Sequence, residues 1–67
     1  MDGAKLKQTR EEKGLTQREV SIKSGVTEGQ LFRIEKGSTK NPRVNTAVAI
    51  AKAIGCDLSE LLDDEEG

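Results

Sequence analysis

With 67 residues, one cysteine, no histidine and a net charge of −1, the chain is sized for a single domain and has no means of forming an internal disulfide. With one cysteine and no histidine, the chain lacks the usual set of cysteine and histidine ligands of a metal site and the usual nucleophile–base pair of an enzyme. The composition therefore argues against a metal centre, a cofactor and catalysis. The longest apolar run, residues 47–51, is far too short to span a bilayer, and we expect a soluble, cytoplasmic protein.

The first predicted helix covers about residues 4–13. Leu6 and Arg10 lie one helical turn apart, and Gly14 supplies the left-handed residue that commonly ends a helix. A second helix then begins at Thr16. Thr16 and Glu19 have the spacing of a capping box, in which each side chain accepts a hydrogen bond from the other residue's backbone N–H.

The second and third helices are predicted near residues 17–24 and 28–36, with a tight turn at Gly25 between them. Thr27 and Gln30 have the spacing of another capping box, which marks the start of the third helix. Two short capped helices joined by a glycine turn are the sequence form of a DNA-binding helix-turn-helix.

Two further helices are predicted after a loop at residues 37–43. The segment 45–54 is rich in alanine, valine and isoleucine on nearly every face, so it should be the most buried helix. Asp57 can cap a short fifth helix that ends near residue 61, and residues 63–67 form an acidic tail that we expect to be disordered. The pattern predicts an all-α, compact five-helix bundle that occupies residues 1–67 as one domain.

Charge is distributed unevenly along the chain. Residues 1–43 carry ten basic and six acidic side chains, whereas residues 44–67 carry one basic and six acidic side chains. A positive half that contains the helix-turn-helix fits a protein with one phosphate-facing side. A basic face that is merely solvated fits the charge pattern equally well.

The chain resembles the lambda-repressor-like, Cro-type helix-turn-helix domain of phage and bacterial regulators over about residues 4–62. The segments that carry the resemblance are Arg10-Glu11-Glu12-Lys13-Gly14-Leu15-Thr16-Gln17, Gly25-Val26-Thr27, Arg33-Ile34-Glu35-Lys36-Gly37, Asn41-Pro42, and Ala51-Lys52-Ala53-Ile54-Gly55 leading to Leu58 through Leu62. The resemblance implies a domain whose third helix enters the major groove of DNA.

The same resemblance implies a role for each matching residue. The positions that face the bases are Thr27, Glu28, Gly29, Phe32 and Arg33. The positions that contact phosphates or the backbone are Gln17, Arg18, Lys36, Lys40 and Arg43. The structural ion pair that links the first helix to the third is Arg10 with Glu35.

Several of these residues also have a simpler interpretation. Arg33 points away from the core, where it either contacts DNA or is solvated. Glu28 either favours the helix N-terminus or accepts from a cytosine amine. Gly29 either permits close approach to the duplex or has no function. Phe32, as the only aromatic residue, is either core or partly exposed against a thymine methyl group.

Gln17, Lys40 and Arg43 are either phosphate contacts or ordinary solvated side chains. Cys56 has no basic neighbour in sequence, so we expect a half-buried apolar residue rather than a redox centre.

These observations favour a sequence-specific, double-stranded DNA-binding transcription regulator in the nucleoid, acting as a repressor. A homodimer reading a palindromic operator is expected, with Val44 and Leu58 in its interface. No small-molecule ligand and no membrane partner is expected. The alternative is a protein-interaction module of the same fold, such as an antirepressor or a toxin–antitoxin subunit, and Glu28 and Gly29 favour it.

Overall fold

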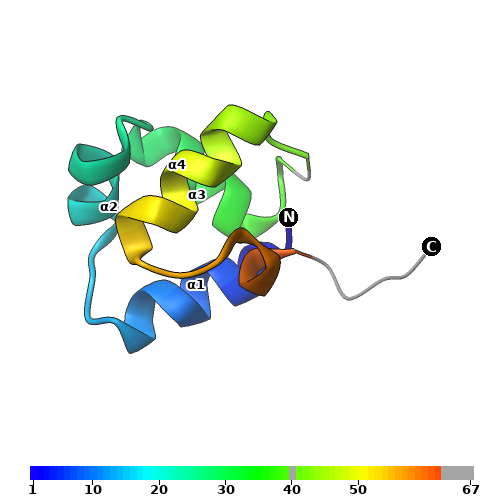
Figure 1. Ribbon diagram of the computed structural model, residues 1–67. Coiled ribbons are helices and arrows are strands. Elements are labelled where there is room, and N and C mark those ends of the chain that lie inside the picture. The colour runs from blue at the N-terminus through cyan, green and yellow to red at the C-terminus, as the bar shows by residue number, and fades with distance from the viewer. Residues whose placement is uncertain (40, 63–67) are drawn as a thin grey trace.

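The computed structural model describes residues 1–39 and 41–62, which form four α-helices, one 3-10 helix and no strand (Figure 1). In chain order the elements are α1 (Gly3–Glu12), α2 (Gln17–Ser24), α3 (Glu28–Lys36), α4 (Val44–Ile54) and η1 (Leu58–Leu61). The all-α prediction is confirmed, although the fifth element is a single 3-10 turn rather than an α-helix. The predicted contact at Lys40 and the predicted acidic tail at 63–67 lie outside the described residues.

The turn between α2 and α3 forms where the glycine indicates. Gly25 adopts φ 80°, in the left-handed region that side chains disfavour, and its N–H donates to the Ser21 carbonyl. At the start of α2 the predicted capping box is present: the Glu19 N–H donates to Thr16 Oγ1 at 3.0 Å, and the Thr16 N–H donates to Glu19 Oε1 at 2.8 Å. Local signals therefore set the beginning and the end of α2.

The capping box predicted for α3 is only half formed. The Gln30 N–H donates to Thr27 Oγ1 at 3.1 Å, as expected for a capping threonine. The Gln30 side chain, however, places its amide oxygen 3.5 Å from that hydroxyl, and no bond from it to the Thr27 backbone is recorded. One backbone donor of α3 is thus satisfied by Thr27.

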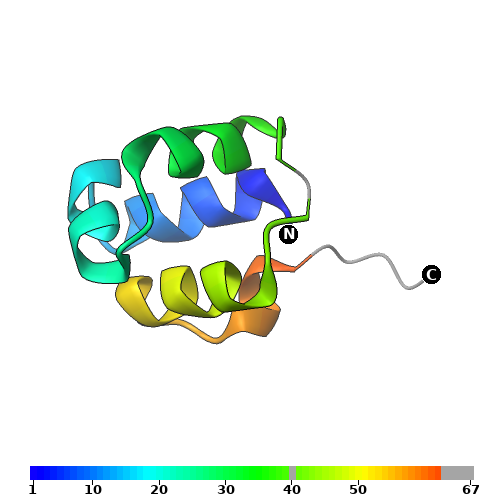
Figure 2. The ribbon, with the colours of Figure 1, turned by 90° about the horizontal axis from the view of Figure 1, so that it is seen from above.

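The core is aliphatic and is shared by all five elements. α1 packs against α3, α2 packs against both α3 and α4, and η1 lies against α1 and α4. Figure 2 shows α2 at one end of the domain, with α3 and α4 running from it on opposite sides. α4 supplies four buried residues, the most of any element, as its sequence predicts. The buried core consists of Leu6, Val20, Val26, Leu31, Ile34, Ala47, Ile50, Ala51, Ile54 and Leu61.

The start of α1 is locked against the end of α3. A Cβ atom added at Gly3 would overlap the Ile34 carbonyl oxygen and lie 2.7 Å from that of Glu35, so only glycine fits there. The Asp2 side chain caps α1, and the Asp2 N–H donates to the Leu61 carbonyl at 2.8 Å. These contacts hold the start of α1 against the end of α3 and against η1.

Candidate nucleic-acid interface

One face of α3 is buried and the other is open. Leu31 and Ile34 lie in the core, three residues apart on the inner face. The predicted base-facing residues all lie on the exposed side, from the N-cap residue Thr27 to Arg33. These are Thr27, Glu28, Gly29, Phe32 and Arg33.

Phe32 is not a core residue. Its exposed fraction is 53%, so the interpretation of Phe32 as buried is wrong. The Nζ atom of Lys36, one turn further along α3, lies 5.3 Å from the centre of the Phe32 ring. A cation over an aromatic face is weakly attractive at an exposed site. The contact holds the Lys36 ammonium group close to the open face of α3.

Behind this face lies the ion pair between α1 and α3. Arg10 Nε donates to Glu35 Oε2 at 2.8 Å and Arg10 Nη2 donates to Glu35 Oε1 at 3.1 Å. Both side chains are largely withdrawn from water, with exposed fractions of 10% and 4%. The hydrogen bonding of the Arg10 guanidinium to the Glu35 carboxylate is the main cause that raises the pKa of Arg10, so this side chain stays positively charged. A third bond joins Arg10 Nη1 to the Leu15 carbonyl at 2.7 Å, directly before α2.

Gln17 belongs to the same network. Its Nε2 atom donates to Glu35 Oε1 at 3.1 Å, so the first residue of α2 is oriented by a carboxylate of α3. Gln17 is only partly buried. The structure therefore gives this predicted phosphate contact a fixed orientation, a feature that the sequence does not reveal.

Two shallow hollows flank α3. The first is lined by side chains from α1, α2 and α3: Lys7, Arg10, Gln17, Phe32, Glu35 and Lys36. The second is lined by α3, the following loop and the start of α4: Gln30, Arg33, Ile34, Thr39, Asn41, Pro42, Arg43 and Thr46. The structure thus groups Gln17 with Lys36 on one side of α3 and Arg33 with Arg43 on the other.

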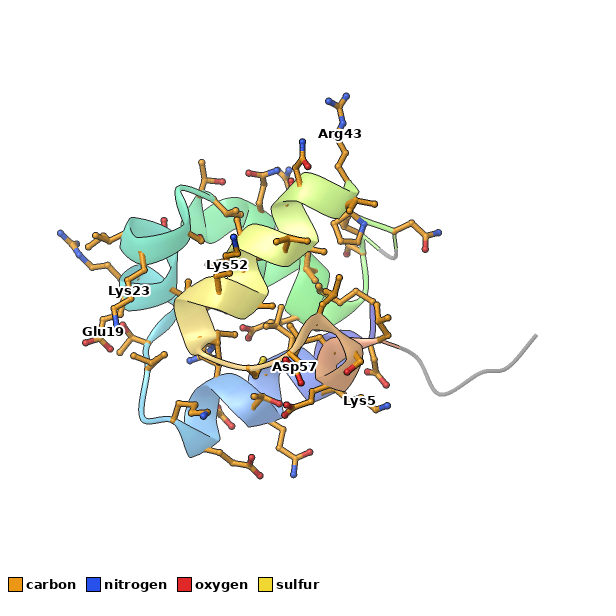
Figure 3. The ribbon with its side chains drawn as sticks, viewed as in Figure 1. Lys5, Glu19, Lys23, Arg43, Lys52 and Asp57 are labelled. Carbon is orange, nitrogen blue, oxygen red and sulfur yellow. The ribbon has the colours of Figure 1, made fainter. Side chains whose placement is uncertain are left out.

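Arg43 and Arg18 are both exposed. Arg43 precedes α4 as its N-cap residue, and Figure 3 shows its side chain extending away from the body of the domain. Arg18 follows Gln17 on α2, but neither hollow includes it. Lys7 was missed by the sequence interpretation, although its position three residues before Arg10 places both on one side of α1.

Other chemistries find little support in residues 1–39 and 41–62. That part of the chain contains no cluster of side chains suited to holding a metal ion. Burial, reinforced by the carboxylate of Glu60, raises the pKa of the Cys56 thiol, so little reactive thiolate is present at neutral pH. None of the helices found there has the length and apolar character that a bilayer-spanning segment requires.

The four-helix fold of the described residues, in which the turn at Gly25 joins α2 to α3, defines a helix-turn-helix domain. A family model described as helix-turn-helix matches residues 6–61, which is most of the chain. The chain belongs to this helix-turn-helix family, and the resemblance to the Cro-type domain is confirmed.

Two curated relatives carry names that refer to transcription. The chain is 40% identical over 60 residues to the uncharacterized HTH-type transcriptional regulator y4dJ of Sinorhizobium fredii, covering 90% of this chain and 77% of that protein. It is 35% identical over 66 residues to the cryptic phage CTXphi transcriptional repressor RstR of Vibrio cholerae, covering 98% of this chain but only 59% of that repressor. No solved structure matches the chain significantly.

Proposed function

We propose that this chain is a transcription regulator that binds double-stranded DNA in a sequence-specific manner and acts as a repressor. The observation that carries the proposal is the outer face of α3, which is exposed and flanked by two hollows with basic side chains. α3 enters the major groove with its N-terminal residues toward the bases. Both curated relatives have regulator names, which supports the same conclusion.

Base reading and backbone contact are divided between different residues. Arg33 is the principal base contact, because an arginine can donate two hydrogen bonds to guanine O6 and N7. Gln17 and Arg43 contact phosphates on opposite sides of α3 and fix its register on the duplex. Arg18, Lys36 and Lys40 add backbone contacts to this interface.

Such a small interface favours a dimer on a palindromic operator, since one domain reads few base pairs. Val44 is 72% exposed at the start of α4 and provides apolar surface for a partner. Leu58 packs partly against its own core, so its share of the interface is smaller. The site of action is the nucleoid in the cytoplasm.

The second candidate is a protein-interaction module of the same fold. Its supporting observation is Glu28, an exposed carboxylate in the first turn of α3 that phosphates would repel. Gly29, next to it, offers no side chain to a base. An antirepressor or a toxin–antitoxin subunit would tolerate both features.

A titration of random duplex DNA separates these two candidates. At about 50 mM salt the chain should bind the duplex, and the affinity should fall steeply by about 200 mM, because phosphate contacts release counterions. Arg43→Ala should make the slope shallower by about one unit, whereas Lys52→Ala, a matched basic residue on α4 beside α2, should leave it unchanged. Absence of binding at the lower salt would favour the interaction module.

A further inference from the structure

Five of the six glycines in the described residues have a structural reason to be glycine. Four have positive φ angles between 71° and 89°: Gly14, Gly25, Gly37 and Gly55. Gly3 has no room for a Cβ atom against the end of α3. Gly29 has neither property, which makes it the exception.

Nothing in the fold requires glycine at position 29. A Cβ atom built there would meet only Thr27 Oγ1, at 4.0 Å, which is ordinary contact. Gly29 is nevertheless the second residue of α3, where glycine is a poorer helix former than alanine. The domain thus carries a residue that weakens its own recognition helix without any gain in packing.

Gly29 lies on the part of α3 that the Arg33 side chain covers. The two residues are one helical turn apart and share a stripe on the exposed side of α3. Side chains on a helix lean toward its N-terminus, so the Arg33 side chain covers the surface over the preceding turn. Arg33 accordingly lines a hollow with Gln30, which belongs to that turn.

We propose that Gly29 is a specificity-determining residue that acts through its missing side chain. The bare first turn lets α3 sit closer to the base edges and leaves the Arg33 guanidinium group free to reach them. This inference rests on the proposed function, because it assigns Gly29 a role within the same DNA interface. The energetic loss within the helix is offset only when DNA is bound.

The test compares Gly29→Ala and Gly29→Gln with the wild-type chain. The probes are the duplex that the wild-type chain enriches most from a random pool and an unselected duplex. Both substitutions should raise the melting temperature, Gly29→Ala by roughly 4 °C. Gly29→Ala should weaken binding to the enriched duplex about tenfold and Gly29→Gln should weaken it further, with little change on the unselected duplex.

Two controls test whether Gly29 acts through Arg33 and whether the effect is particular to position 29. In an Arg33→Ala background the loss caused by Gly29→Ala should shrink to less than about threefold, since the two residues act together. Gln8→Ala introduces alanine on an exposed part of α1 and should leave both affinities unchanged.

Three outcomes would overturn the inference. Unchanged affinity of Gly29→Ala for the enriched duplex would show that the missing side chain has no role in binding. Equal losses on both duplexes would show that it does not act on specificity. If the wild-type chain enriched no duplex at all, the proposed function would fail, and this inference with it.

Discussion

Replacing Arg10 by alanine removes three hydrogen bonds that join α1 to α3 and to the loop before α2. Two of these bonds hold the carboxylate of Glu35, which is 4% exposed, and the third holds the Leu15 carbonyl before α2. In the variant, Gln17 Nε2 still donates to Glu35, but it is a neutral donor that does not balance the carboxylate charge. Breaking a buried pair by removing one partner is destabilising by about 3–5 kcal/mol, because the other charge stays buried.

That magnitude is large for a domain of 67 residues. At about 0.05–0.15 kcal/mol per residue, the free energy of unfolding is roughly 3–10 kcal/mol. In a domain this small each kcal/mol shifts the melting temperature by about 4–8 °C, so Arg10→Ala should lower it by at least about 12 °C. Lys7→Ala changes an exposed basic residue on the same helix and should lower it by less than about 4 °C.

Thermal unfolding followed by circular dichroism measures both variants. The double variant Arg10→Met with Glu35→Leu replaces the pair by apolar side chains of similar size and should melt above either single variant at the same positions, because no unpaired charge remains. If Arg10→Ala melted within a few degrees of Lys7→Ala, the ion pair would not stabilise the domain as argued. The same would follow if the decrease in melting temperature of the double variant equalled the sum of the decreases of its two single variants.

Two further predictions concern other parts of the fold. Gly3→Ala should be destabilising by about 1–3 kcal/mol in urea unfolding, because its Cβ overlaps the Ile34 carbonyl and crowds that of Glu35; an unchanged midpoint would show that α1 can shift away from α3 at no loss. At about pH 8, Cys56 should react more slowly with a disulfide reagent in the folded chain than in the urea-unfolded chain, since burial and Glu60 raise its pKa and reduce the thiolate fraction; equal rates would contradict this.

The sequence predicts the helix-turn-helix well because its signals are local. Thr16 with Glu19 and the glycine at position 25 act within one turn of the chain, so the bounds of α2 follow from neighbouring residues alone. The exposed side of α3 follows in the same way from the spacing of Leu31 and Ile34.

Features that depend on how helices dock could not be predicted in this way. The sequence alone gives no reason for a glycine at position 3, and the reason becomes clear only when α1 is packed against the end of α3. The bond from Gln17 to Glu35 and the position of Lys7 beside α3 likewise require the packed structure. The burial of Phe32 could not be predicted for a different reason. A large aromatic side chain is usually buried, whereas the position of Phe32 beside Arg33 on α3 favours exposure, and the structure shows exposure.

The central claim is that α3 reads DNA sequence, and the ratio of affinities for an enriched and an unselected duplex measures it most directly. For the wild-type chain the ratio should be about 10³ or more, and Arg33→Ala should reduce it by roughly 5- to 150-fold while binding to the unselected duplex changes little. Arg43→Ala should weaken binding to both duplexes by a similar factor and so preserve the ratio. If Arg33→Ala weakened both equally, α3 would not read sequence through this residue, and DNA shape or a protein partner would take the place of base contacts.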